Sequence, residues 1–353
     1  MKGLILAAGL GTRLRPLSLS RPKPLLPVAN KHIVSYIIED MAEAGIKDIA
    51  IVISHKKDIV VDELNASDYG VSLTFLTQET LNGIGGAVRL AKDFVGDEPF
   101  MVYLGDNFAQ DGVKEFVNKF HETNPDALLL LTHVNNPSDF GIAELNKDGS
   151  IKSVEEKPEN PKSNLAVTGI YMFNKRIFEA IDNITPSDRG ELEIPDAIQW
   201  LINNNEKVIS EQIKGRWKDT GKPEDLLEAN QLILDRLNFE IKGKVKGEIE
   251  GNVGIEEGTV VEEGAKIVGP VIIGKNCIIG SGTYVGPYSS IGDNVTLRNA
   301  DVEFVIILKD TFINTNKRIV NSIIGEKSKI TSITDDLPQG SKLIIGDFSQ
   351  IEL

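Results

Sequence analysis

Positive charge gathers around a glycine turn near the start of the chain. The segment "LAAGLGTRLRPLSLSRPKPLLPV" contains Gly9 and Gly11, which are followed by Arg13 and Lys23. A dinucleotide fingerprint would need a glycine where Leu14 stands, and no Gly-Lys-Ser/Thr run forms a Walker A loop. The residues instead predict a flexible loop whose backbone N–H groups approach an anion, with a guanidinium and an ammonium bound to phosphate oxygens. The alternative interpretation is a solvated basic turn.

Two aspartates occupy positions at which a metal ion could be held. Asp106 follows the apolar run in "FMVYLGDN", and Asp219 stands in "GRWKDTGKPEDL". Ligands of open α/β sheets bind beyond the carboxyl ends of strands, which is where Asp106 is expected. Mg²⁺ usually takes one or two carboxylates together with substrate phosphates. Both aspartates are equally compatible with ordinary turns or a helix cap.

Charge and composition limit the possible partners. The chain has 353 residues, with 38 basic and 52 acidic side chains and a formal charge of −14. This balance disfavours a nucleic-acid partner, so any phosphate must be bound locally. The single cysteine, Cys277, excludes an internal disulfide and is typical of the cytoplasm. No apolar run approaches the roughly 20 residues of a membrane span, so no membrane partner is expected.

Elements up to about residue 240 alternate between apolar strand-like runs and helical patterns. This order predicts an α/β fold with a Rossmann-like mixed, mainly parallel sheet covered on both faces. The expected strands are Lys2–Ala8, Ile49–Ser54, Ser72–Leu76, Phe100–Leu104, Ala127–Val134 and Val167–Phe173. The expected helices are Ile33–Ala44, Gly85–Phe94, Val113–Glu122, Pro195–Asn203 and Pro223–Phe239.

A six-residue repeat replaces the helical period after about residue 240. Aliphatic residues stand at every sixth position from Ile249 to Leu297, with small residues such as Ala265 and Cys277 four places after some of them. Neither a helix nor a flat strand has this period, whereas a parallel β-helix does. The repeat breaks near Glu303 and returns around "SIIGEKSKI". The sequence therefore predicts two domains, 1–240 and 241–353.

The N-terminal segment closely resembles the signature of sugar-phosphate nucleotidyltransferases, with its Gly-x-Gly-Thr-Arg-Leu-x-Pro-Leu core and downstream Lys-Pro. The resemblance covers essentially the whole chain and is strongest to long members that carry a C-terminal left-handed β-helix and make dTDP-glucose. It implies in-line attack of glucose 1-phosphate on the α-phosphorus of dTTP or UTP, assisted by Mg²⁺, with release of pyrophosphate. The chain departs from the family pattern at Ala8, where short bacterial members have glycine, and at "NGIGG", where the family has "DGLAQ".

The same resemblance implies the site residues. Asp106 and Asp219 would flank the metal, Gln78 and Gly83 would contact the pyrimidine, and Glu156 would bind sugar hydroxyls. The expected catalytic residues are Arg13, Lys23, Asp106, Lys157 and Asp219. The expected substrate-binding residues are Ala8, Gly9, Gly11, Gln78, Gly83, Asn107, Gly141, Glu156, Lys157, Thr168 and Arg189. Without the resemblance, Glu155-Glu156-Lys157 would pass for a solvated face.

Three other functions remain open at this point. One is a UDP-sugar pyrophosphorylase acting on glucose or amino-sugar 1-phosphate, and another is a bifunctional enzyme that is also an acetyltransferase. The last histidine is His133, so the C-terminal half lacks the usual base for acetyl transfer. A non-catalytic regulatory subunit is disfavoured because the charged residues expected to act in catalysis are all present. By analogy with other β-helix proteins, a homo-oligomer is expected, and a trimer through the β-helix is plausible.

Overall fold

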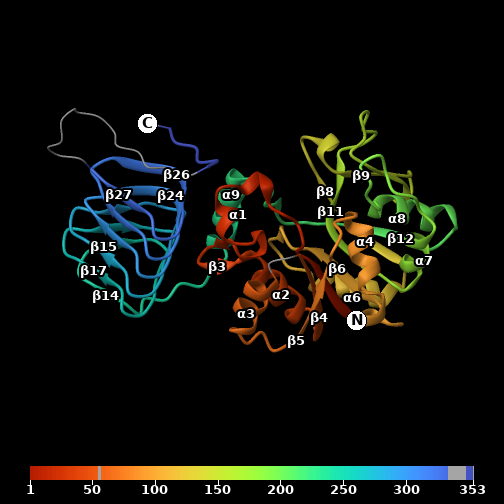
Figure 1. The fold of residues 1–353 in the computed structure, drawn as a ribbon, viewed down its shortest axis with the longest axis horizontal. Helices are drawn as coiled ribbons and strands as arrows, with labels where there is room; N and C mark the ends of the chain where they lie inside the picture. Colours follow the sequence, from red (N-terminus) through yellow and green to blue (C-terminus); the bar gives the residue numbers. More distant parts are fainter. Residues whose placement is uncertain (55–56, 333–346, 353) are drawn as a thin grey trace. The chain divides into compact units, whose positions relative to one another are not determined.

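Two compact units make up the chain. The computed structural model describes residues 1–54, 57–332 and 347–352 (Figure 1). One unit consists of Met1–Leu10, Pro22–Pro24 and Val34–Asp219, and the other of Gly11–Arg21, Leu25–Ile33 and Thr220–Leu353. Two short N-terminal segments thus belong with the C-terminal unit, while the domain boundary at residue 240 stays a prediction. Among the described helices, none combines the length and apolarity needed to cross a membrane.

A nine-stranded mixed sheet forms the centre of the first unit. Its strands are β1 (Lys2–Leu6), β4 (Asp48–Ile53), β5 (Ser72–Thr77), β6 (Phe100–Leu104), β8 (Ala127–His133), β9 (Gly141–Leu145), β10 (Ile151–Glu156), β11 (Leu165–Phe173) and β12 (Val208–Gln212). The main path runs β10-β9-β11-β6-β1-β4-β5, with β8 beside β11 and β12 beside β8. Strands β6, β1, β4 and β5 are parallel, whereas β11 runs antiparallel to β6, β8 and β9. The predicted Rossmann-like mixed sheet is confirmed.

Helices of the first unit differ in part from the predicted ones. They are α2 (Ile33–Glu43), α3 (Lys57–Asn65), α4 (Gly83–Leu90), α5 (Lys92–Val95), α6 (Lys114–Thr123), α7 (Arg176–Asp182) and α8 (Ile194–Asn203), with 3₁₀ turns η2 (Lys23–Leu25) and η3 (Pro137–Asp139). The single helix expected over 85–94 is divided into α4 and α5. The Ala91 N–H donates to the Val88 carbonyl at 3.0 Å, a three-residue turn that interrupts the helical ladder.

One core cluster of this unit lies between one face of the sheet and the helices α4, α5, α7 and α8. Alternate strand residues such as Leu4, Val52 and Val102 point to this face and are fully buried. They pack with helix residues that include Val88 and Ile198. The intervening strand residues, such as Ile5, Ile51 and Met101, point to the other face and are also fully buried. These strands are therefore covered on both faces, as their apolar sequences predicted.

Short parallel strands stacked in coils form most of the second unit (Figure 1, cyan to blue). They are β14 (Lys244–Val245), β15 (Glu248–Glu250), β16 (Val253–Ile255), β17 (Val260–Val261), β18 (Lys266–Val268), β19 (Val271–Ile273), β20 (Ile278–Ile279), β21 (Tyr284–Val285), β22 (Ser289–Ile291), β23 (Thr296–Arg298), β24 (Asp301–Ile307), β25 (Phe312–Asn314), β26 (Arg318–Ile324) and β27 (Lys329–Thr331). Ile249 pairs with Ile267, and Ile267 with Val285, so one coil spans three six-residue repeats. The predicted parallel β-helix is confirmed, and its left-handed turn stays a prediction.

The repeat breaks where the coils shorten. Val285 pairs with Val302 and Ile291 with Ile307, so these steps are one and two residues shorter than the earlier coils. The long strand β24 forms both pairings, and Phe304 within it has a φ of 52°. A left-handed residue inside a strand turns the chain at that point. The break predicted near Glu303 therefore lies at a corner of the coil.

The second unit also contains the N-terminal segments 11–21 and 25–33, whereas Lys23 of the cationic loop belongs to the first unit. These segments form η1 (Thr12–Leu14), α1 (Leu17–Ser20) and the hairpin of β2 (Pro27–Val28) and β3 (Lys31–His32). The unit also includes helix α9 (Pro223–Leu234). Helix α9 packs on β2, β24 and β26. It ends earlier than the predicted Phe239 because the Arg236 N–H donates to the Ile233 carbonyl in a three-residue turn.

Candidate active site

An ion pair joins Lys23 to Asp106, the aspartate that follows β6. The Lys23 ammonium lies 2.5 Å from Asp106 Oδ2, and the Lys23 residue is 8 % exposed. Asn107 Nδ2 donates to the other Asp106 oxygen at 2.8 Å. Asp106 stands just beyond the carboxyl end of β6, as the apolar run predicted. The structure therefore brings together two of the expected catalytic residues, which lie far apart in the sequence.

A small two-stranded sheet brings the second aspartate to the same place. Strand β13 (Trp217–Asp219) pairs antiparallel with β7 (Asn107–Ala109), so Asp219 lies opposite Asn107. Because Asn107 directly follows Asp106 in the sequence, the carboxylates of Asp106 and Asp219 belong to the same short stretch of paired backbone. Both strands have only three residues and show no periodicity, so the pairing could not be predicted from the sequence.

The environment of Asn107 fits a divalent cation. Its residue is 3 % exposed, and within the described part of the chain its Oδ1 has no hydrogen-bond partner. An orphaned buried oxygen carries a free-energy cost that a cation would remove. No group of three or more acidic, histidine or cysteine side chains forms an all-protein metal site among the described residues. Two carboxylates and an amide oxygen instead fit an ion that takes further ligands from a substrate.

A second cluster surrounds Glu156 at the end of β10. Arg189 Nη2 lies 3.3 Å from Glu156 Oε1, and Lys157 Nζ lies 3.6 Å from the same oxygen. The side chains of Lys157 and Arg189 are 47 % and 44 % exposed, so both cations are accessible. Burial raises the pKa of Glu156 above its ordinary value, although Lys157 and Arg189 partly offset this effect. A ligand here would meet two positive groups around a partly desolvated carboxyl group.

Glu193 supports this cluster and was not predicted. Its residue is 5 % exposed, and its Oε1 accepts hydrogen bonds from Arg189 Nη2 at 2.8 Å and Ser187 Oγ at 2.7 Å. Arg189 thus pairs with three carboxylates, those of Glu156, Glu193 and, at 3.9 Å, Glu191. In the sequence, "SDRGELEIPD" reads as a helix start with capping acids, and α8 does begin directly after Glu193. An acid followed by an apolar helix start was the available signal.

The loop after β5 is bonded to the loop that carries Arg189. The Leu192 N–H donates to the Asn82 carbonyl at 2.8 Å, and the Leu192 carbonyl accepts from the Gly85 N–H at 2.8 Å. Gly83 has a φ of 90°, and a β-carbon there would lie 2.8 Å from the Leu192 carbonyl oxygen. Gln78 is buried and donates to the Asn82 side chain at 3.1 Å. The predicted pyrimidine and sugar-phosphate residues therefore lie on adjoining loops.

Aromatic contacts link the Lys157 cluster to β13. The Lys157 N–H donates to the Phe140 carbonyl at 3.0 Å, and the Phe140 ring meets the Trp217 ring edge-on at 5.7 Å. Trp217 Nε1 donates to the Thr168 carbonyl at 3.0 Å. Lys157 itself has a φ of 43°, a left-handed conformation uncommon outside glycine. Phe140 and Trp217 were not predicted as site residues, and they connect the two groups of charged side chains.

Other predicted residues occupy varied positions. Gly141 adjoins the cluster, since a β-carbon there would lie 3.2 Å from Glu156 Oε2. The buried Thr168 hydroxyl donates to the Leu130 carbonyl at 3.0 Å, so its side chain is bonded within the sheet. Ala8 is buried, whereas Gly9 is exposed. Gly11 and Arg13 belong to the second unit, where Gly11 has a φ of 61° and precedes η1. Their approach to the carboxylates stays a prediction.

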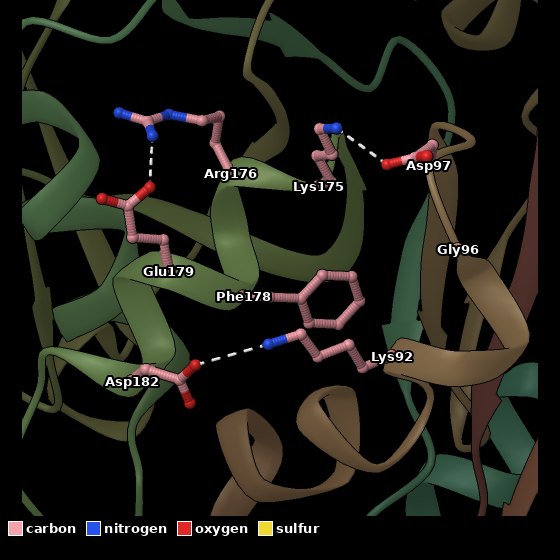
Figure 2. Close-up of a pocket in the computed structure, with 8 residues that line it drawn as sticks. All are labelled: Lys92, Gly96, Asp97, Lys175, Arg176, Phe178, Glu179 and Asp182. Atoms are coloured by element: carbon pink, nitrogen blue, oxygen red, sulfur yellow. Dashed lines mark hydrogen bonds and ion pairs between the residues drawn. The ribbon is translucent and has the colours of Figure 1, made fainter.

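A surface hollow on the first unit contains none of the predicted residues. Figure 2 shows its lining, in which Lys92 pairs with Asp182 and Lys175 with Asp97. Arg176 pairs with Glu179 in the same hollow. Each of its three cations thus already has an acidic partner. None of the residues that line the hollow belongs to the cluster around Glu156.

Comparison with known proteins identifies the family. The model of the nucleotidyl transferase family matches residues 2–236, and that of the GMPPB C-terminal domain matches residues 267–335. The chain belongs to the nucleotidyl transferase family. Among its relatives is the low-salt glycan biosynthesis nucleotidyltransferase Agl11 of Haloferax volcanii, 43 % identical with all of both chains covered. The glucose-1-phosphate thymidylyltransferase of Streptomyces griseus is 40 % identical over all of this chain and 99 % of its own.

Solved structures of this nucleotidyl transferase family lead to the same assignment. A structure described as a putative glucose-1-phosphate thymidylyltransferase of Bacillus anthracis has a TM-score of 0.63 at 36 % identity, covering 68 % of this chain and 98 % of its own. The prediction of a sugar-phosphate nucleotidyltransferase is therefore confirmed, and the chain is an enzyme of nucleotidyl transfer. Enzymes of this kind generally use a divalent metal ion.

Proposed function

We propose that this nucleotidyl transferase condenses dTTP with glucose 1-phosphate to give dTDP-glucose and pyrophosphate. The observation that carries the proposal is the pairing of β7 with β13, which sets Asp219 beside Asp106 and Lys23 in the same unit as the Glu156 cluster. One group of residues suits a triphosphate with its metal, and the other suits a sugar phosphate. The full-length similarity to the Streptomyces thymidylyltransferases supports the choice of substrates.

For the sugar phosphate to attack, the negative charges of the two substrates have to be neutralised, whereas no base is needed to activate it. A phosphate oxygen of glucose 1-phosphate forms a bond to the α-phosphorus, and the bond to the leaving pyrophosphate breaks in line. The attacking phosphate is already anionic near neutral pH, so no protein group has to remove a proton. Lys157 and Arg189 bind this phosphate and reduce its repulsion from the triphosphate, while Glu156 accepts hydrogen bonds from sugar hydroxyls. Such catalysis consists mostly of positioning and charge stabilisation.

Lys23 and Arg13 bind the triphosphate in this proposal. Lys23 is held by Asp106, so its ammonium is oriented before the substrate arrives. Asp106 and Asp219, with the amide oxygen of Asn107, would hold Mg²⁺, which neutralises charge on the transferring and leaving phosphates when bound. Gln78 presents its amide, and Gly83 its backbone, to the pyrimidine edge.

A UDP-sugar pyrophosphorylase is the second candidate, because a solved UDP-glucose pyrophosphorylase bound to UDP-glucose has a TM-score of 0.60 at 28 % identity. Thymine differs from uracil by one methyl group, which a pocket discriminates by about 1–3 kcal/mol. A pyrophosphate-release matrix of dTTP, UTP, ATP, CTP and GTP against glucose, mannose and glucosamine 1-phosphates distinguishes the candidates. We expect the highest kcat/KM for dTTP with glucose 1-phosphate; a clear preference for UTP would establish the second candidate.

The acid limb of the pH profile is expected to report Glu156. Burial raises the pKa of this carboxyl group, so it becomes protonated on acidification at a higher pH than an ordinary glutamate. Protonation removes a hydrogen-bond acceptor and weakens the placement of Arg189, so kcat/KM for glucose 1-phosphate should fall. Burial favours the neutral form in the fold, so this protonation is not expected to unfold the protein.

A pH series of kcat/KM tests this prediction. Glu156→Gln should remove the part of the acid limb that Glu156 contributes and lower the plateau, while the part caused by protonation of glucose 1-phosphate itself remains. Glu144→Gln is the matched control, because hydrogen bonding by Lys152 lowers the pKa of Glu144. An unchanged limb in Glu156→Gln would contradict the assignment of Glu156.

We further propose a cytoplasmic homo-oligomer, with the β-helix as the contact between copies. The single buried thiol of Cys277 supports a reducing compartment. The continuous stack of coils supports association through a long flat side.

A further inference from the structure

One buried asparagine joins the N-terminal hairpin to the β-helix. Asn230, on α9, is fully buried. Its Oδ1 accepts hydrogen bonds from the Ala29 N–H at 2.8 Å and from Ser290 Oγ at 2.6 Å, and its Nδ2 donates to the Tyr288 carbonyl at 2.9 Å. A buried amide whose oxygen and nitrogen are both hydrogen-bonded fixes the arrangement of the groups that it bonds. Asn230 therefore fixes the hairpin tip, α9 and one coil of the β-helix relative to one another.

The tip of the hairpin makes a direct contact with the same coil. Ala29 and Asn30 have φ values of 45° and 62°, as a tight two-residue hairpin turn requires. Asn30 Nδ2 donates to the Ile291 carbonyl at 2.7 Å. Asparagine tolerates this left-handed conformation and also supplies the amide donor. The hairpin tip is thus held by two hydrogen bonds, one from each of two consecutive residues.

An ion pair holds the chain ahead of the hairpin. Arg21 Nη2 lies 2.7 Å from Glu326 Oε1, which belongs to the turn between β26 and β27. The two side chains are 13 % and 29 % exposed, so solvent screens the pair less than an ordinary surface pair. Arg21 and Ala29 lie on either side of Lys23 in the sequence. Both N-terminal segments of the second unit, 11–21 and 25–33, are therefore bonded to its coils.

We propose that α9 and the β-helix form a clamp that holds Arg13 and the segment around it, residues 11–21, in place to bind the triphosphate, with Asn230, Asn30 and Glu326 as its positioning residues. The inference rests on the proposed function only in assigning Arg13 to the triphosphate. A segment that is bonded to the rest of its unit has lost conformational freedom before the ligand arrives, so binding costs less entropy. Release of the clamp should weaken triphosphate binding and leave the sugar-phosphate cluster unaffected.

Two variants release the clamp without disturbing a core. Asn30→Gly keeps the left-handed turn and removes the amide, and Glu326→Gln removes the charge that faces Arg21. We expect each to raise the KM for dTTP by about threefold to tenfold, the size of one net hydrogen bond. The KM for glucose 1-phosphate should change by less than about twofold, because the Glu156 cluster makes no use of these hydrogen bonds.

Asn294→Gly provides the matched control. Asn294 also has a positive φ, 59°, and its Nδ2 donates to Asp310 Oδ1 at 2.9 Å. The substitution removes one amide hydrogen bond between coils of the β-helix and leaves the hairpin contacts intact. Both KM values should match those of the unsubstituted enzyme.

Limited trypsin digestion tests the clamp without any substrate. Arg15, Arg21 and Lys23 each precede proline, which blocks trypsin, so Arg13 offers the one cleavable bond between residues 11 and 30. Asn30→Gly and Glu326→Gln should each accelerate cleavage after Arg13 at least threefold, and Asn294→Gly should not. If no substrate pair turns over but this cleavage accelerates, the proposed function fails and the clamp stands. The clamp would be refuted if both variants kept the cleavage rate and the dTTP KM of the unsubstituted enzyme. It would also be refuted if the KM values for dTTP and for glucose 1-phosphate rose equally.

Discussion

Asp106→Asn is expected to lower pyrophosphate release at least a hundredfold, a loss of about 2.7–4 kcal/mol of transition-state stabilisation. The substitution keeps the size of the side chain but removes the charge that faces Lys23 and the proposed Mg²⁺. A neutral amide neither holds the lysine ammonium as firmly nor replaces a carboxylate as a ligand for a hard cation. Steady-state turnover at saturating substrates, repeated across a Mg²⁺ titration, measures the effect.

Asp97→Asn is the control for this variant. Asp97 also pairs with a lysine, Lys175 at 2.7 Å, but it lies in the surface hollow of Figure 2. Its turnover should equal that of the unsubstituted enzyme, and both variants should keep their melting temperatures within a few degrees. Turnover by Asp106→Asn within threefold of the unsubstituted enzyme would remove Asp106 from the catalytic set.

Lys157→Ala is expected to lower kcat/KM for glucose 1-phosphate by about a hundredfold or more, the usual effect of removing one charge-stabilising group. The side chain is 47 % exposed and pairs with Glu156, so its loss should affect the bound phosphate more than the fold. Initial rates at varied glucose 1-phosphate and saturating dTTP measure the effect. The KM for dTTP should change little, because the triphosphate is assigned to other cations.

Lys152→Ala is the matched control, since Lys152 lies on β10, the strand that Lys157 directly follows, and pairs with Glu144 at 2.6 Å. It should leave all kinetic constants unchanged. If Lys157→Ala instead raised the KM values of both substrates equally, the separation of the site into two binding groups would be wrong.

Much of the fold could be predicted because its signals are long and periodic. The apolar run before Asp106 defined β6, and the six-residue repeat from Ile249 defined the coils of the β-helix. Burial on both faces of a strand and a repeating core position leave clear traces in a sequence. Strands β9, β10 and β12 were not predicted, since they lie toward the sheet edges and are only partly apolar.

Site residues that belong to a sequence motif could be predicted. Site residues that take part only through packing in the folded chain were missed. Asp106 and Lys157 follow strand ends and match a family signature, whereas Glu193 and Trp217 act through contacts that only the fold creates. Asn230 did leave a signal, because it is the one polar residue on the otherwise apolar buried face of α9. A buried polar residue needs partners, and that requirement could have drawn attention to it.

The interleaved course of the chain limits how this enzyme can be divided. The polypeptide passes from one unit to the other after residues 10, 21, 24, 33 and 219. A truncation after Asp219 would therefore retain the cationic loop yet discard α9 and the coils to which the loop is bonded. Replacing the β-helix with that of another protein would break the same hydrogen bonds. The N-terminal loop and the coils that it contacts are therefore expected to be inherited together.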